Sequence, residues 1–248
     1  MKSIYRLSSP EVEEALAATR TVVIPLGSVE QHGPHLPCGT DTMAAELVAA
    51  EVAERLDALL VPFGPYGVTP IHAGHPGTIS LSRHTFEALL SDICRQLVDG
   101  GARWFLFVNW HEGNIPSMDA VAMELQKSNP GVYVVSAQAC YVAQEIYAGE
   151  GGELTHGGGI EAMAVMAYDP SLVKETRAAT RPERAAALDR MRRGRTVYGY
   201  ITDVTEIDRE GWYGDPAWAT RERAEAFPHR VADEIVRAFE EIRKLRLG

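Results

Sequence analysis

Short apolar runs that alternate with helical segments constrain the fold of this chain more than any other feature. The runs that have the length and composition of buried strands lie at 19–27, 59–63, 102–110 and 132–138. The segments that carry apolar residues at helical spacing lie between them, at 42–56, 83–101 and about 117–126. Crossovers of this length join parallel strands, so the order predicts a mainly parallel sheet with helices on both faces, a three-layer α/β/α sandwich.

The second half of the chain continues with less regular segments. A glycine-rich turn near 151–159 precedes an apolar helix, and the polar segment 175–194 has a helical composition. The aromatic, irregular segment 198–218 is a candidate lid or subunit contact, and a final amphipathic helix closes the chain. No Pro/Ser linker divides the sequence, so we expect a single domain over residues 1–248.

Composition narrows the classes of partner. The formal net charge is -10 and the acidic and basic residues are interspersed, a balance that repels phosphate backbones, so we expect no nucleic-acid partner. The N-terminal residues lack the apolar core of a secretory signal, and no apolar run reaches the roughly 18 residues that span a bilayer. We therefore expect a cytoplasmic protein without membrane contact.

The residues that follow the predicted strands are rich in metal-ligand types. Histidine occurs in SVEQHG, in GPYGVTPIHAGHPGT and in NWHEGN, which each follow a predicted strand. In open α/β sheets, ligands bind at the carboxyl ends of the strands. The three cysteines are far apart and form no CxxC pair, so a metal at this edge would be held by nitrogen and oxygen.

Four of these residues could form one site. Glu30 and His32 are two apart on expected extended backbone, so their side chains project to the same side. Asp41 at the mouth of the next helix and His111 at a neighbouring strand end can complete a metal site. A carboxylate that uses both oxygens, as Asp41 could, can bridge two ions. The alternative is structural: in it, Asp41 only caps its helix and His32 is a loop histidine held by neighbouring carbonyl groups.

Five motifs, in order, connect the chain with a known family. They are PLGSVEQHGPHLPCGTD, HPGTISL, NWHEGN, HGGGIEA and GDPAWAT. Together they resemble the creatininase family of dinuclear metal hydrolases. The resemblance implies a three-layer α/β/α fold, a homohexamer and two divalent metal ions per chain, Zn, Mn or Fe. It also implies hydrolysis of C–N bonds in cyclic amides, formamides or peptide ends, or the opening of a carbocyclic ketone.

Carried over by position, the resemblance assigns ligands to two ions. Glu30, Asp41 and His111 correspond to the ligands of one ion, and His32 with the shared Asp41 to ligands of the other. The second ion needs a further carboxylate, for which we prefer Glu161 of HGGGIEA.

The rival ligand is Glu112. In creatininase itself a glutamate stands two residues after the strand-end histidine, where this chain has Gly113, and the glutamate here comes one residue earlier. Glu112 could instead orient a ligand from outside, contact substrate or take part in catalysis. The resemblance assigns His156 as the catalytic histidine, and an imidazole beside an activated water can move protons near neutral pH.

Substrate contacts are expected from the later loops. Creatininases have tryptophans near the positions of Gln138 and Gly152, so creatinine itself is a poor candidate substrate here. We name His75, Gln138 and Gly157 as candidate substrate-binding residues, with a satisfied loop histidine as the alternative for His75.

Four functions are compatible with these residues to different degrees. The favoured one is a metal-dependent hydrolase that cleaves a C–N bond of a small-molecule substrate with a metal-activated water. The alternatives are a hydrolase that opens a polyol-derived cyclic ketone, and a non-catalytic metabolite-binding member that should have lost a ligand. A dinuclear phosphoesterase fits less well, because the chain is acidic and has no P-loop.

Overall fold

A five-stranded parallel sheet forms the centre of the molecule. The structure, a computed structural model, describes residues 1–174, 183–194 and 196–247. The strands run in the order β1-β3-β2-β4-β5, and every pair is parallel. Their bounds are β1 Lys2–Ser3, β2 Thr21–Leu26, β3 Leu59–Leu60, β4 Trp104–Asn109 and β5 Tyr133–Gln138.

Burial on both faces explains why β2 and β4 are apolar throughout. All residues of both strands are buried. Along β4, Leu106 packs into the core on one face of the sheet, and Phe105 and Phe107 pack into the core on the other. Val23 of β2 lies beside Leu106 in the register and belongs to the same core. A strand with core on both sides loses the alternation of polar and apolar residues that marks a half-exposed strand.

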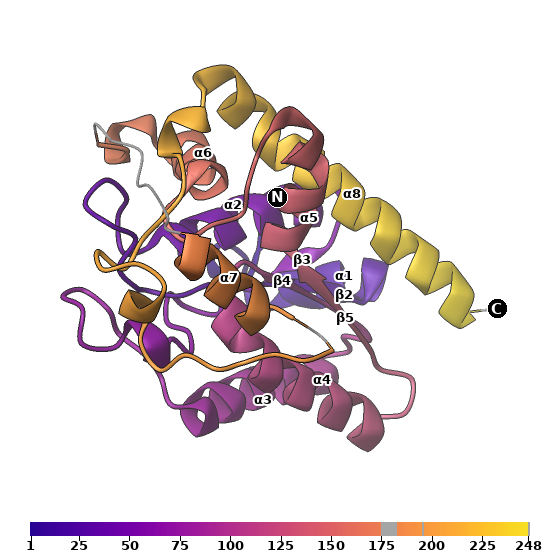
Figure 1. Cartoon of the computed structure of the whole chain (residues 1–248). Coiled ribbons are helices and arrows are strands. Elements are labelled where there is room, and N and C mark those ends of the chain that lie inside the picture. The colour runs from indigo at the N-terminus through magenta and orange to yellow at the C-terminus, as the bar shows by residue number, and fades with distance from the viewer. Residues whose placement is uncertain (175–182, 195, 248) are drawn as a thin grey trace.

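Helices cover both faces of the sheet, as Figure 1 shows. On one side, three helices pack against the sheet: α1 Ser9–Thr19, α3 Arg83–Asp99 and α4 Ile115–Ser128. On the other side lie α2 Thr40–Arg55, α5 Ala139–Tyr147, α6 Gly159–Tyr168 and α8 Arg221–Leu247. The expected α/β/α sandwich is therefore confirmed.

Several elements differ from the expectation in extent. The strand predicted over 59–63 is limited to Leu59–Leu60, where it pairs with both β1 and β2. The structure adds β1, α1 and α5, none of which was predicted as a separate element. The helix predicted over 175–194 lies partly outside the described residues, and α7 Glu183–Arg192 forms its second part.

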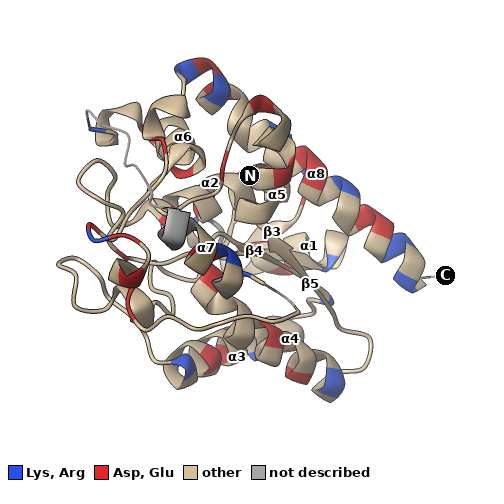
Figure 2. Ribbon diagram, in the orientation of Figure 1, with Lys and Arg blue, Asp and Glu red and all other residues tan. Residues whose placement is uncertain are grey.

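Charged side chains lie on the outer helices and are absent from the three longest strands of the sheet. Acidic and basic residues alternate along α8 and are mixed on α3 and α4, as Figure 2 shows. The strands β2, β4 and β5 contain no charged residue. Within the described part of the chain, no helix is both long enough and apolar enough to cross a bilayer.

Candidate metal centre

Five buried polar residues gather at the carboxyl ends of β2 and β4. The loop after β2 supplies Glu30 and His32, and the first turn of α2 supplies Asp41. His111 follows directly after β4, and Glu161 lies in the first turn of α6. Each has 7% or less of its surface exposed. The structure thus brings together every residue that was predicted as a metal ligand.

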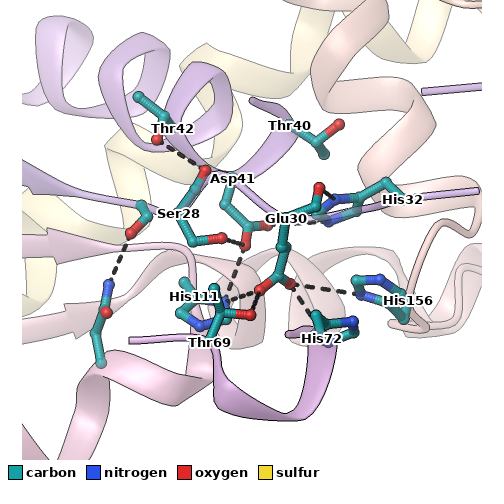
Figure 3. Close-up of polar contacts among 12 residues, drawn as sticks. Ser28, Glu30, His32, Thr40, Asp41, Thr42, Thr69, His72, His111 and His156 are labelled. Atoms are coloured by element: carbon teal, nitrogen blue, oxygen red, sulfur yellow. Dashed lines mark hydrogen bonds and ion pairs between the residues drawn. The ribbon is translucent and has the colours of Figure 1, made fainter. Parts of the chain in front are cut away.

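The first group consists of Glu30, Asp41 and His111. The Nδ1 of His111 lies 3.0 Å from Oδ2 of Asp41 and 3.4 Å from Oε2 of Glu30. Its Nε2 lies 3.0 Å from the carbonyl oxygen of Val68, which can only accept a hydrogen bond. Nε2 therefore carries a proton, and Nδ1 faces the two carboxylates, as Figure 3 shows. This is the orientation that a ligand imidazole requires.

The second group consists of His32, Asp41 and Glu161. The Nε2 of His32 lies 3.3 Å from Oδ1 of Asp41 and 3.6 Å from Oε2 of Glu161. Its Nδ1 contacts the carbonyl oxygen of Glu30 at 3.0 Å and so carries a proton. In the described structure, Nε2 is buried and makes no hydrogen bond. A buried nitrogen without a hydrogen bond that faces two carboxylates fits a bound cation, so the donor set passes this test.

Asp41 belongs to both groups. Its Oδ2 faces His111 and its Oδ1 faces His32, so each carboxylate oxygen serves one group. The two sets, Glu30–Asp41–His111 and His32–Asp41–Glu161, each place their ligand atoms within 4.8 Å of one another.

Three hydrogen bonds hold the carboxylates in place. The hydroxyl of Ser28 donates to Oδ2 of Asp41 at 2.8 Å, and the hydroxyl of Thr69 donates to Oε2 of Glu30. The N–H of Gly157 donates to Oε2 of Glu161 at 2.6 Å. Sequence reasoning missed Ser28 and Thr69. The only available signal was that both hydroxyls lie in loops that leave the predicted strands.

The charges of the cluster are strongly interdependent. Burial disfavours charge on each group, but the His111 and His72 imidazoles hold the pKa of Glu30 well below its ordinary value. His32 likewise holds the pKa of Asp41 at about 2, against burial. Burial, together with repulsion from Asp41, raises the pKa of Glu161 to about 8 despite the nearby His32.

The neighbouring carboxylates raise the pKa values of two histidines in the cluster. Burial would lower the pKa of His32, but the carboxylates of Glu161 and Asp41 raise it to about 10. Glu30 and Asp41 similarly raise the pKa of His111 well above its ordinary value, against burial. The buried carboxylates of Glu30 and Asp41 therefore favour positive charge on the histidines beside them, and such a setting suits a bound cation.

His156 and His72 lie beside the cluster. Nδ1 of His156 is 3.7 Å from Oε1 of Glu30, and Nε2 of His72 is 3.6 Å from the same oxygen. The ring of His156 lies between those of His32 and His72, at centroid distances of 4.3 and 4.2 Å. Burial and the charges of the neighbouring histidines lower the pKa of His156 well below its ordinary value. The surroundings of His156 therefore favour its uncharged form.

Glu112 does not join the cluster. Its Oε1 accepts a hydrogen bond from the Tyr141 hydroxyl at 3.0 Å and lies 3.2 Å from Nε of Arg193. At Gly113, an added Cβ would lie 2.1 Å from the Val68 carbonyl oxygen and 2.5 Å from Nε2 of His111. The position that holds a glutamate in creatininase therefore has no space for a side chain here, and Glu161 is the carboxylate beside His32.

Three predicted substrate contacts lie outside the cluster. His75 is partly exposed, with Nε2 3.9 Å from Oδ1 of Asp203. Gln138 accepts a hydrogen bond from Nδ2 of Asn109 at 2.7 Å. Gly157 binds Glu161 through its N–H and accepts a hydrogen bond from His35 through its carbonyl. None of the three lines the cavity described next.

A cavity of about 270 Å³ opens above the cluster. Its floor contains Glu30, Asp41, His111, His156 and Glu161. The cavity is also lined by apolar residues, by Thr69, His72 and Arg83, by the Glu112–Arg193 pair and by the irregular segment 198–213. This segment, predicted as a lid or a subunit contact, lines the cavity within a single chain through Tyr198, Tyr200, Ile201, Val204, Ile207 and Tyr213.

The fold is thus a parallel α/β sandwich with a buried cluster of carboxylates and histidines at the carboxyl ends of its strands, and two groups within this cluster could hold a metal ion. The creatinine amidohydrolase family model matches residues 5–239. The chain therefore belongs to the creatininase family, which confirms the resemblance and makes it a creatininase-family hydrolase.

Two relatives have different named activities. The chain is 31% identical over 257 residues to the mycofactocin precursor peptide peptidase of Mycobacterium tuberculosis, which covers 96% of this chain and 94% of that one. It is 30% identical over 202 residues to the creatinine amidohydrolase of Pseudomonas putida, covering 73% and 78% of the two chains.

Solved creatininase structures have the same fold. A manganese form is 26% identical, with a TM-score of 0.76 and coverage of 96% of this chain and 97% of that one. A variant described as a zinc–zinc form is 25% identical, with a TM-score of 0.74 and the same coverage.

Proposed function

We propose that this chain is a dinuclear metal-dependent hydrolase that cleaves a C–N bond of a small substrate with an activated water. The observation that carries the proposal is Asp41, which places one carboxylate oxygen in each of two ligand groups. The manganese and zinc forms of the related creatininases support it.

The donor set suits borderline divalent ions. Glu30, Asp41 and His111 would hold one ion, and His32, Asp41 and Glu161 the other. Carboxylate oxygen and imidazole nitrogen together favour Zn, Mn or Fe. Two such ions, when bound, polarise the substrate carbonyl and lower the pKa of a water molecule.

We assign the proton transfer to His156. Its Nε2 lies 2.6 Å from the carbonyl oxygen of Gln31, an acceptor, so this nitrogen carries the proton and Nδ1 has a free lone pair. Nδ1 faces Glu30 at the floor of the cavity. His156 would accept the proton of the attacking water at Nδ1 and return it to the leaving nitrogen.

The cavity favours a small substrate or the end of a chain. A volume of about 270 Å³ holds only part of a longer molecule. The relative that aligns over 96% of this chain is a peptide peptidase, whereas the creatinine amidohydrolase aligns over 73%. We therefore place an amide at a peptide end first among the candidate substrates.

An Asp41→Asn variant tests this function. The wild-type enzyme, loaded with Mn or Zn, is assayed against a creatinine, an N-formyl amino acid, a short peptide and a cyclic polyol ketone. We expect turnover of an amide by the wild type and no detectable turnover by Asp41→Asn, because the variant cannot bridge two ions. Metal analysis should find fewer ions per chain in the variant.

The matched control is Asp92→Asn, which neutralises an exposed carboxylate that pairs with Arg95 on α3. It should retain both activity and metal. Normal turnover by a fully metal-loaded Asp41→Asn enzyme would show that the assignment is wrong.

A further inference from the structure

Gln31 connects the proposed centre with three other segments. It stands between Glu30 and His32 in the sequence, and it is 9% exposed. Its Nε2 lies 3.2 Å from Nδ1 of His72 and 2.5 Å from the carbonyl oxygen of Gly211. Its main-chain carbonyl oxygen accepts the hydrogen bond from His156. Gln31 is not one of the candidate metal ligands.

The position of the proton on His156 determines the hydrogen-bond partners of the Gln31 side-chain amide. His156 donates from Nε2 to the Gln31 carbonyl, so this nitrogen cannot also accept a hydrogen bond from the side-chain amide that lies 3.2 Å away. The two amide hydrogens then go to Gly211 and to Nδ1 of His72. With Nδ1 as acceptor, the proton of His72 is on Nε2, which faces Glu30.

The contact with Gly211 reaches the segment that lines the cavity. Gly211 has a φ of +75°, and an added Cβ would lie 2.9 Å from Nε2 of Gln31. A glycine is therefore needed for the amide to approach this main chain. Two residues later, the N–H of Tyr213 donates to the carbonyl oxygen of His156 at 2.8 Å. The segment is thus connected to His72 through Gln31 and to His156 through Tyr213.

Further hydrogen bonds fix both the side chain and the main chain of Gln31. Its Oε1 accepts from the N–H of Gly33 at 3.0 Å, and its main-chain N–H donates to the Thr78 hydroxyl at 3.0 Å. The side chain and the main chain of one residue are therefore fixed by separate partners, and the direction of the amide is set.

We propose that Gln31 is a positioning residue for the reaction: its side-chain amide fixes the orientation of the His72 imidazole and ties the cavity-lining segment to His72 and His156. The inference rests on the proposed function of the site. Gln31 touches neither ion nor water in this role and acts through the histidines.

Gln31→Met and Gln31→Glu variants test the inference in the zinc-loaded protein. Methionine has nearly the same shape without hydrogen-bonding groups, and glutamate retains the acceptor but loses the donor. Nitrogen NMR of histidine-labelled protein reports which ring nitrogen carries the proton, with signals assigned through a His72→Gln variant. We expect the Nδ1 signal of His72 to lose its hydrogen-bonded position in both variants.

The kinetic expectation is a fall in kcat of roughly 10- to 100-fold with little change in KM, as for other residues that orient a catalytic group. Zinc content should equal that of the wild type. Gln126→Met is the matched control, because it removes a side-chain amide that binds the main chain of Val134 far from the centre.

Unchanged ring signals in Gln31→Met would overturn the inference, and so would loss of zinc or an unchanged kcat. Failure of the proposed function looks different, because the wild-type enzyme would then be inactive against every substrate while the ring signals of His72 still responded to the substitution.

Discussion

Gly113 shows how closely the main chain packs around a ligand imidazole. We expect Gly113→Ala to lower the free energy of unfolding by about 1–3 kcal/mol, because the new methyl group would overlap the Val68 carbonyl oxygen and Nε2 of His111. The same overlap should displace His111 and weaken metal binding. Chemical denaturation and metal analysis measure the two effects.

Gly149→Ala is the control for this substitution, because an added Cβ there meets no atom within 4 Å. It should leave both quantities unchanged. If Gly113→Ala were as stable and as rich in metal as the wild type, the close packing around His111 would be contradicted.

The candidate metal ligands could be predicted from the sequence where they lie in recognisable motifs. Glu30, His32 and Asp41 lie within one motif, and the sheet rule places His111 beside them. The partners of these groups were not predictable, because the hydroxyl of Thr69 comes from a loop 39 residues away in the chain. Their metal-binding roles stay predictions until the metal is measured.

At the scale of elements, the first turn of α3 provides a direct test of helix capping. Ser82 accepts a hydrogen bond from the N–H of Thr85 through its hydroxyl at 3.1 Å. Replacing Ser82 with alanine leaves this N–H without its side-chain acceptor, and the free energy of unfolding should fall by about 1 kcal/mol. Ser91→Ala, within the same helix, should be neutral or slightly stabilising. Equal losses in the two variants would contradict the capping role.

Strand and helix alternation was predictable because β2, β4 and β5 are apolar runs of ordinary length. The exceptions have two physical causes. β1 and β3 contain two residues each, so neither carries a periodic pattern, and their pairing depends on long-range contacts. The helix α5 begins directly at the end of β5, with no turn residues between them to mark a boundary.

At the scale of the whole molecule, metal removal should lower thermal stability. Three carboxyl groups share a buried space, and ions that bind the folded chain alone would add stability through linkage. A chelator should therefore lower the Tm by about 5–10 °C, and Zn or Mn should restore it. Calorimetry measures the shift, and Asp41→Asn should respond less. An unchanged Tm after complete metal removal would contradict this coupling.

Two parts of the chain contribute to the cavity, one with the candidate metal ligands and the other with much of the remaining lining. Every candidate metal ligand lies between residues 30 and 161, whereas Arg193 and the segment 198–213 form much of the wall and rim. Substitutions in the later part can change which molecule fits without touching a ligand. We therefore expect substrates in this family to diverge through changes in the C-terminal third of the chain, and the names of two relatives, a peptide peptidase and a creatinine amidohydrolase, agree with this expectation.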